Sequence, residues 1–416
     1  MQNNKIMEFV NSTEFYRDLN ISEDYFSNVV VEKGILSKDN LQHETSRLLS
    51  DSRKYANMNL LTVARTSGSS GQVVEVYWDK DDLMKSNLCL WRLRKKYYGI
   101  LPSSKYISFH SIIYNGNKPI VPENIMYFEG GKQLSFSKYH LKDTDLFQYF
   151  ECMNQFQPEW MFIQPSIASR LLEFCTNNRV ELPKTLKYIE LTGELVTRKF
   201  EEQLKDAFKI NIANMYGSNE VNSIAYECPC GNMHLMTDNV LVQLCGTQQD
   251  EKGLEGDVIV SSLHNSKFPI LGYSLGDRVH INFNTKCKCE NPAPIIDIIK
   301  GRTVDIQIYK DGTELNTFLF TYCVERVNSL LGNPIQQFKV ILEDNNMVRV
   351  KFRLASEFSG WKDTIQEEFW KECKKVFDLE KDMIIVEFVD DFIPLSKSGK
   401  YKIIERRTNS GRETIH

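Results

Sequence analysis

The sequence predicts an α/β protein with a large N-terminal domain and a small, mobile α+β C-terminal domain. Between residues 106 and 215, short apolar strands alternate with amphipathic helices, which is the pattern of mostly parallel sheet layers with covering helices. Residues 224–300 show short alternating runs separated by turn signals, which predict an antiparallel β subdomain, and we expect the segment 273–277 to end one of its strands. A compact α+β pattern follows Gly301-Arg302, so we expect one domain over residues 1–302 and a lid domain over 303–416.

Size and composition exclude several classes of protein. The 416 residues are 42% hydrophobic and 25% charged, with a net charge of -4 and a pI near 6.1, so nothing favours binding to nucleic acid or to an anionic membrane. The polar N-terminus predicts no signal peptide, and no uncharged apolar run approaches a membrane span. The ten cysteines then favour free thiols or metal ligands over disulfides. We expect a cytoplasmic monomer or homodimer.

A segment rich in serine and glycine lies between two predicted strands, at residues 60–64 and 73–78. It reads Thr66-Ser67-Gly68-Ser69-Ser70-Gly71. Glycines let a ligand approach the backbone, and amide and hydroxyl groups can surround an anion. The segment differs from the mononucleotide P-loop, because no lysine ends it and a strand follows it. It predicts a phosphate-binding turn, and the alternative is a mobile turn without function.

The elements that follow build the expected parallel sheet. A helix is predicted at 80–98, with Leu83, Leu88, Leu90, Trp91 and Leu93 on its apolar side. The next strand ends on His110, which either borders a pocket or packs in the core. Residues 118–140 resemble a loop. The remaining elements are the helices 143–156, 167–177 (capped by Ser166) and 197–208, and the strands 160–163, 186–191 and 210–215.

Ligands of parallel sheets bind at the carboxyl ends of the strands. Two predicted loops lie there, Thr192-Gly193-Glu194 and Tyr216-Gly217-Ser218-Asn219-Glu220. These two loops belong to an ordered set of motifs that resembles the adenylate-forming (ANL) superfamily. The other members of the set are the hydroxyl-rich segment, Tyr273-Ser274-Leu275-Gly276-Asp277, Gly301-Arg302 and Pro394 to Lys400. The closest branch resembles the phenylacetate-CoA ligase and CapK-like group, which is similarly short and has a cysteine cluster after the Tyr-Gly-Ser-x-Glu loop. The resemblance covers residues 60–405.

This resemblance implies a reaction in two steps. A carboxylate attacks the α-phosphate of ATP to give an acyl-adenylate and pyrophosphate, and a thiol then takes the acyl group. Thr66 to Gly71 would hold the β- and γ-phosphates, Glu220 would hold Mg²⁺, and Lys400 would bridge the carboxylate and the α-phosphate. The implied nucleotide site further includes Gly193, Glu194, Tyr216 along the adenine, Gly217, Ser218, Asn219, and Asp277 and Arg302 at the ribose.

Two positions depart from the family pattern. Asn219 stands where the family usually has threonine, although an amide can still donate a hydrogen bond to the α-phosphate. Val304, followed by Asp305, stands where an acidic residue or lysine usually forms the hinge of the small domain. A catalytically inactive nucleotide-binding module is therefore one alternative to the enzyme.

Two Cys-x-Cys pairs predict a structural zinc site. Cys228, Cys230, Cys287 and Cys289 offer four thiolates from two short turns, which suits a closed tetrahedral site. His234 is close enough in sequence to replace one cysteine. The alternative is a set of free thiols in β turns.

The sequence thus predicts a ligase that uses ATP and Mg²⁺ to activate a small carboxylic acid. CoA is the favoured acceptor, and the phosphopantetheine of a separate carrier protein is the alternative. Aromatic residues near Trp160, Phe162, Tyr114 and Phe109 fit an aryl or other apolar acid, but core packing explains them equally well. A plain α/β scaffold would not explain the ordered motifs.

Overall fold

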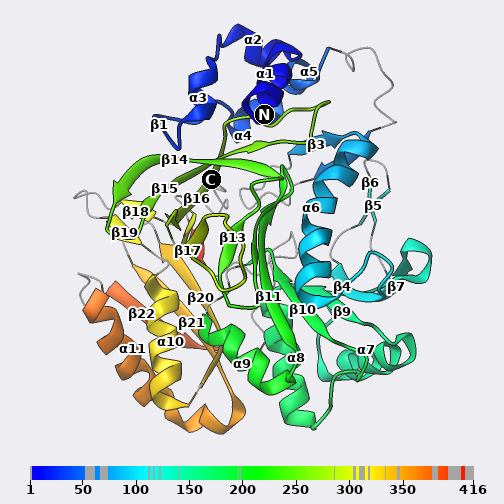
Figure 1. Cartoon of the computed structure of the whole chain (residues 1–416). Coiled ribbons are helices and arrows are strands. Elements are labelled where there is room, and N and C mark those ends of the chain that lie inside the picture. Colours follow the sequence, from blue (N-terminus) through cyan, green and yellow to red (C-terminus); the bar gives the residue numbers. More distant parts are fainter. Residues whose placement is uncertain are drawn as a thin grey trace. The chain divides into compact units, whose positions relative to one another are not determined.

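The computed structural model divides the chain into an N-terminal unit, which extends to Lys300, and a C-terminal unit from Gly301 (Figure 1). The predicted border, after Arg302, lies two positions further on. The structure describes residues 2–51, 61–65, 74–110, 113–115, 118–120, 123–138, 140–194, 196, 198–284, 286–302, 306–308, 314–316, 319–332, 334–343, 347–376, 383–391 and 404–407. None of its described helices is long and apolar enough to cross a membrane.

The N-terminal unit combines nine α-helices and one 3₁₀ helix with strands β1 to β17 within the described residues. The helices are α1 (Gln2–Asn11), α2 (Glu14–Asp18), α3 (Glu23–Ser27), α4 (Lys38–His43), α5 (Thr45–Leu48), α6 (Lys80–Tyr98), η2 (Glu129–Gly131), α7 (Asp143–Phe156), α8 (Pro165–Asn178) and α9 (Arg198–Phe208). The strands are β1 (Val30–Val31), β2 (Thr62–Arg65), β3 (Glu75–Trp78), β4 (Tyr106–His110), β5 (Ile113–Asn115), β6 (Lys118–Ile120), β7 (Ile125–Phe128), β8 (Gln133–Ser137), β9 (Trp160–Ile163), β10 (Tyr188–Thr192), β11 (Asn211–Ser218), β12 (Asn222–Glu227), β13 (Met233–Leu235), β14 (Val240–Gln249), β15 (Leu254–Ser262), β16 (Tyr273–Asn282) and β17 (Ile295–Arg302).

Thirteen of these strands form one sheet, in the order β1-β14-β15-β16-β17-β13-β12-β11-β10-β9-β4-β8-β7. Strands β8, β4, β9, β10 and β11 are parallel neighbours, and β12 to β15 pair mainly antiparallel. The antiparallel strands predicted for 224–300 therefore continue the parallel sheet. The predicted α/β fold class is confirmed.

Helices cover both faces of the parallel strands (Figure 1). On one face, Leu90 of α6 packs in a cluster with Trp160 of β9 and Tyr188 of β10. The next residue along each of these strands points to the opposite face. On that opposite face, the ring of Tyr149 in α7 stacks on Phe136 of β8 at 4.3 Å. A strand that is buried on both faces must be apolar throughout, which explains why Trp160–Ile163 is an unbroken apolar run.

Three sequence predictions within this unit are wrong in detail. The segment 118–140 contains β6, β7 and β8 in place of a loop. Helix α8 has Pro165 at its first position and Gln164 as its N-cap, because proline already has helical φ and lacks the amide that would otherwise need a partner. Ser166 is therefore inside the helix. The Tyr273–Asp277 segment begins a strand, β16, where we expected it to end one.

Within its described residues, the C-terminal unit has two α-helices and one 3₁₀ helix with a four-stranded sheet of order β22-β21-β20-β23. Its elements are β18 (Ile306–Ile308), β19 (Glu314–Asn316), α10 (Leu319–Leu331), β20 (Ile335–Glu343), β21 (Val348–Leu354), η4 (Ser356–Trp361), α11 (Lys362–Val376), β22 (Ile384–Phe388) and β23 (Ile404–Arg407). Phe320 of α10 and Phe369 of α11 pack with Val350 and Phe352 in its core. The α+β pattern of this unit was predicted, but α10 and β23 were not.

Candidate active site

The parallel strands bring five chain segments to one edge of the sheet. Strands β8, β4, β9, β10 and β11 have the spatial order 2-1-3-4-5 by their sequence order, which is that of a doubly wound fold. In such sheets the ligand site lies beyond the carboxyl ends of the strands, at the point where the strand order reverses. The segments that follow β10 and β11 are the two loops that the sequence places in the nucleotide site.

The Tyr216–Glu220 segment lies at the end of β11 and in the turn after it. The Tyr216 hydroxyl donates to the Asp277 carboxylate at 2.7 Å, and the Tyr273 hydroxyl donates to Glu220 Oε1 at 3.2 Å. Glu220 is buried, with 8% of its surface exposed. The structure therefore joins two predicted motifs, which are 61 positions apart at Tyr216 and Asp277, through two hydrogen bonds.

Close backbone packing requires glycine in this segment. A Cβ atom on Gly217 would lie 2.4 Å from the Asn222 carbonyl oxygen, well inside van der Waals contact. The pairing of β11 with β12 shifts register between Tyr216 and Gly217, so a bulge redirects the strand just before the turn.

A buried hydrogen-bond network holds the turn from below. The Asn239 side chain, which is fully buried, donates to the carbonyls of Val221 (3.2 Å) and Ser223 (2.6 Å). Its oxygen accepts from the Ser86 hydroxyl of α6 at 2.7 Å, and Asn222 donates to the same hydroxyl at 2.9 Å. Helix α6 and the turn that carries Glu220 are thus fixed to each other.

The Gly193-Glu194 loop is tied to the next helix. Glu194 accepts hydrogen bonds from the Ser166 amide and the Ser166 hydroxyl, both at 2.9 Å. A carboxylate in this place satisfies an amide of the first turn of α8 and is favoured by the helix dipole. Glu194 therefore fixes the loop after β10, and Gly193 leaves the space beside Gln164 open.

His110 ends β4 next to the same edge and is held at both ring nitrogens. Nε2 donates to the Glu123 carbonyl at 2.9 Å, and Nδ1 lies 2.9 Å from the Ser135 hydroxyl. Burial lowers the pKa of His110 below its ordinary value, and the charge of Lys138 acts in the same direction. The neutral imidazole fits this arrangement, because Nδ1 can accept while Nε2 donates.

Several predicted site residues cannot be placed in this geometry. Thr66, Ser67, Gly68, Ser69, Ser70, Gly71, Lys400 and the hinge residues Val304 and Asp305 lie outside the described residues. Strands β2 and β3, which flank the hydroxyl-rich segment, pair antiparallel as predicted. Arg302 is the last residue of β17.

The predicted metal site gathers three cysteines and a histidine. Among the described residues, Cys228, His234, Cys287 and Cys289 offer ligand atoms that all lie within 4.8 Å of one another. Cys230 is exposed, and its thiol lies near those of Cys228 and Cys287 without belonging to the set whose ligand atoms are all this close. The geometry thus favours the set that contains His234 over the set of four cysteines.

The contacts inside this group suit a tetrahedral ion. The sulfur atoms of Cys228 and Cys287 are 3.6 Å apart, close to the edge of about 3.8 Å that Zn–S bonds of about 2.3 Å give. His234 Nδ1 lies 3.0 Å from the Ala293 carbonyl, which leaves Nε2, 3.2 Å from Cys289 Sγ, as the ligand atom. A zinc ligand histidine usually donates its other nitrogen to such a partner.

Neighbouring groups stabilise a thiolate at Cys287. Burial alone raises the pKa of this thiol, but hydrogen bonds from the Cys289 amide, the Asn232 side chain and His234 outweigh burial and lower the pKa to about 5. The Asn232 amide lies 3.2 Å from the sulfur. Metal ligation requires the thiolate, so this environment favours a metal site over free thiols.

Three residues of this region, Asn239, Ser86 and Gln164, carry no motif signal in the sequence. They are single polar residues, which give no pattern along the chain. Tyr273 begins a predicted motif, but its contact with Glu220 depends on the pairing of β15 with β16.

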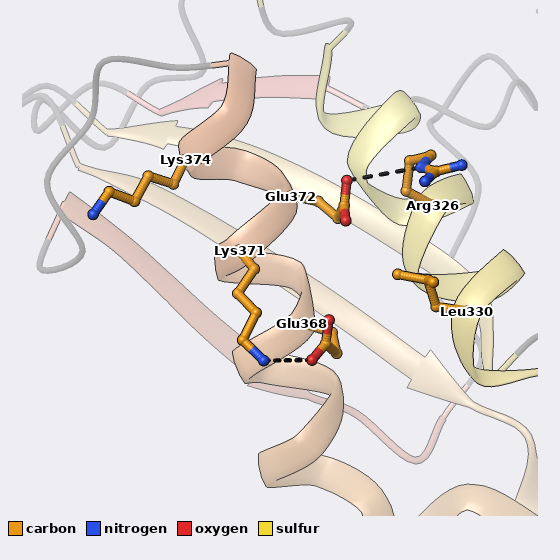
Figure 2. Close-up of a pocket in the computed structure, with 6 residues that line it drawn as sticks. All are labelled: Arg326, Leu330, Glu368, Lys371, Glu372 and Lys374. Atoms are coloured by element: carbon orange, nitrogen blue, oxygen red, sulfur yellow. Dashed lines mark hydrogen bonds and ion pairs between the residues drawn. The ribbon is translucent and has the colours of Figure 1, made fainter.

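A shallow groove lies between α10 and α11 of the C-terminal unit (Figure 2). Ion pairs cross or border it, with Arg326 and Glu372 at 3.8 Å and Lys371 and Glu368 at 2.6 Å. Leu330 and Lys374 complete the lining. The groove contains none of the predicted site residues, and its charges largely neutralise one another.

One known protein resembles this chain over most of its sequence. No protein-family model matches the chain. The chain is 23% identical over 386 residues to protein CapK of Staphylococcus aureus, covering 86% of this chain and 82% of that protein.

Solved structures share the fold at low identity. One is 2-hydroxyisobutyryl-CoA ligase in complex with R3-HIB-AMP, with a TM-score of 0.73 and 12% identity, covering 98% of this chain and 88% of that one. Another is O-succinylbenzoate coenzyme A synthetase from Bacillus subtilis in complex with AMP, with a TM-score of 0.50 and 14% identity, covering 83% and 68%. At these identities the likeness shows the fold.

Proposed function

Because the chain has the fold of the AMP-forming acyl-CoA ligases of the adenylate-forming superfamily, we propose that it activates a carboxylic acid with ATP and passes the acyl group to a thiol. The superfamily predicted from the ordered motifs is confirmed. The observation that carries the proposal is the junction of two motifs at the carboxyl edge of the sheet, where Tyr216 contacts Asp277 and Tyr273 contacts Glu220.

We propose a distinct role for each residue of the nucleotide site. Asp277 binds the ribose hydroxyls, Tyr216 lies along the adenine, and Arg302 assists at the ribose. Glu220 holds Mg²⁺ at the phosphates, since a carboxylate that accepts one bond from Tyr273 keeps lone pairs for the ion. Gly217, Ser218 and Asn219 border the α-phosphate, and Gly193 leaves room beside it. Thr66 to Gly71 bind the β- and γ-phosphates, and Lys400 stabilises the charge that builds during attack.

CoA is the favoured acceptor, and a carrier protein with phosphopantetheine is the alternative. The similar structures include complexes with CoA or acyl-AMP, which supports a CoA ligase. Within this class we propose the phenylacetate-CoA ligase-like branch and an aryl or other small acid. The ten cysteines, all within the described residues, form no disulfide, which fits the proposed cytoplasmic location. An inactive nucleotide-binding module is the competing function, and Asn219 and Val304 are the residues that favour it.

We also propose that Cys228, His234, Cys287 and Cys289 bind a structural zinc ion. Four protein ligands leave no open position for a water molecule, so the ion would stabilise the fold and take no part in catalysis. Elemental analysis of protein purified without chelators tests this proposal, and a preparation that is folded and contains no zinc would refute it.

ATP–pyrophosphate exchange with a panel of aryl, alkyl and amino acids tests the enzyme. We expect exchange that depends on the added acid. Lys400→Ala should abolish adenylate formation and spare thioester formation from a supplied acyl-adenylate, and Lys402→Ala is the matched control. Equal loss of both half-reactions would contradict the role of Lys400. ATP binding without exchange for any acid would instead favour the inactive module.

A further inference from the structure

The edge of the sheet at the reversal of strand order is lined by His110 and Gln164. Strand β4 ends on His110, and Gln164 directly follows its neighbour β9. These are the first and third parallel strands in the chain, and the crevice beyond them is where doubly wound sheets bind their ligands. In a ligase whose nucleotide lies over β10 and β11, the acid would bind at this neighbouring part of the edge.

Gln164 carries a polar atom that lacks a partner. Its backbone is extended, with φ -78° and ψ 150°, and its side chain makes no capping bond to α8. Gln164 Oε1 is inaccessible to solvent and has no hydrogen-bond partner within the structure described here. A buried carbonyl oxygen of this kind is unfavourable until a donor reaches it.

Gly193, in the loop after β10, lies beside Gln164. The nearest atom to a Cβ built on Gly193 is Gln164 Cγ at 3.9 Å, so glycine at this position places no side chain against Gln164. This loop is fixed by Glu194 and cannot easily move to satisfy the oxygen.

His110, unlike Gln164, has no ring nitrogen left to bind a ligand. Both of its ring nitrogens are engaged, by Ser135 and by the Glu123 carbonyl. Ser135 in turn accepts from Ser108 at 2.8 Å, and Gln133 donates to Ser108 at 2.8 Å. This network is complete within itself, so a ligand group would have to break it.

A second buried oxygen without a partner lies on the same edge. Ser218 Oγ, at the end of β11, is inaccessible to solvent and makes no hydrogen bond to the residues that the structure describes. Ser218 belongs to the loop that carries Glu220, so it borders the place where the acyl-adenylate would form. The two atoms lie at the ends of β9 and β11, the strands on either side of β10, and together they indicate a polar ligand more strongly than either alone.

From these contacts we infer that Gln164 is a specificity-determining residue that accepts a hydrogen bond from a hydroxyl or amino group on the acid. The inference rests on the proposed function and narrows it, because it favours acids with such a donor over the purely apolar acids that the aromatic residues suggested. Ser218 is the second group positioned to contact the polar end of the substrate.

Matched sets of acids test this inference in the exchange assay. Each set keeps one carbon skeleton and changes one substituent, as in propionate, lactate and alanine, or benzoate, 4-hydroxybenzoate and 4-aminobenzoate. In the set that fits the site, we expect kcat/KM for a substituted acid to exceed that of its unsubstituted parent by about 10- to 100-fold. Gln164→Leu should reduce this ratio toward one by slowing the substituted acid, and Gln164→Glu, which keeps an acceptor oxygen, should retain part of it.

Gln148→Leu, on an exposed position of α7, makes the same chemical change away from the site and should leave the ratio unaltered. Wild-type exchange that favours the unsubstituted parent in every set would refute the inference and leave the proposed function intact. A ratio that survives in a folded Gln164→Leu variant would refute it as well. Absence of exchange with every acid would refute the proposed function itself.

Discussion

The strongest structural prediction concerns the buried ion pair between Arg94 of α6 and Glu190 of β10. Arg94 Nε lies 2.8 Å from Glu190 Oε2, and Nη2 lies 2.5 Å from Oε1, in a bidentate arrangement. The hydroxyls of Tyr188 and Tyr226 donate to the same Oε2, at 3.0 Å and 3.2 Å. Glu190 is fully buried, so its charge has no access to water.

Aromatic rings enclose the guanidinium of this pair. Its carbon lies 4.5 Å from the ring centre of Trp91 and 4.8 Å from that of Trp160. Burial disfavours the charged form of Arg94, but the attraction of Glu190 outweighs this effect and raises its pKa, so the arginine remains charged. Helix α6 is thereby fixed to the centre of the parallel sheet by a charge pair and by aromatic contacts.

Arg94→Leu should reduce the free energy of unfolding of the N-terminal unit by about 3–5 kcal/mol, because it leaves the Glu190 carboxylate buried with two hydroxyl partners only. A loss of this size corresponds to a fall in melting temperature of about 6–10 °C at about 2 °C per kcal/mol. The double variant Arg94→Leu/Glu190→Leu should lose less free energy of unfolding than the two single variants lose together, because it leaves no unpaired buried charge.

Calorimetry and tryptophan fluorescence measure this effect, and Trp91 and Trp160 report directly on the site. Arg92→Leu is the matched control, because Arg92 lies on the same helix with 74% of its side chain exposed and only a 4.0 Å contact to Asp238. It should leave the melting temperature nearly unchanged. If Arg94→Leu were as stable as Arg92→Leu, the pair would not fix α6 in the way that the contacts indicate.

Three further predictions test other contacts of the N-terminal unit. Cys289→Ser should lose the bound zinc and lower the melting temperature, whereas Cys230→Ser should retain the metal; loss of zinc in both variants would return Cys230 to the ligand set. Asn239→Asp should raise the Mg²⁺ concentration that adenylation requires, because it removes the amide hydrogens that hold the Val221 and Ser223 carbonyls beside Glu220, and an unchanged Mg²⁺ dependence would contradict this positioning role. The lowered pKa of His110 means that the unfolded chain binds a proton more readily than the folded chain, so stability should fall as the pH drops below 6.5. In His110→Asn this fall should be shallower than in the wild type and in the exposed control His43→Asn; identical slopes in denaturant titrations would exclude the effect.

Much of the fold follows from patterns that are local in sequence. Predicted helices 80–98 and 143–156 match α6 and α7, and predicted strands 106–110 and 160–163 match β4 and β9. Apolar runs and helical periodicity depend only on neighbours along the chain. The strands between 118 and 137 were not predicted, because they are short and because Gly130 and Gly131 interrupt the alternation, whereas pairing with β4 supplies the missing stability.

The site could be predicted in part for the same reason. Motifs located Tyr216, Glu220 and Asp277, and the cysteine spacing located a metal site. Motifs could not separate His234 from Cys230 as the fourth ligand, since that choice depends on the pairing of β13 with β12 and β17. They also could not show that Glu194 contacts Ser166, because this bond joins the ends of two neighbouring strands.

Helix α6 was predicted correctly, but the apolar pattern behind the prediction explains only part of how the helix packs. Its apolar residues predicted the helix, yet Leu88 is 41% exposed and the buried residues include Asp82, Ser86 and Arg94. Each of these polar residues contacts a different part of the unit.

Asp82 accepts from Ser266, Ser86 donates to Asn239, Arg94 pairs with Glu190, and Tyr97 lies near Cys289 at the metal cluster. Buried polar groups must find partners, and only one position of the helix satisfies all four at once. Apolar packing would allow α6 to slide along the sheet, whereas these bonds set its register. The same helix therefore connects the predicted metal cluster to the turn that carries Glu220, and removal of zinc should disturb Mg²⁺-dependent adenylation as well as stability.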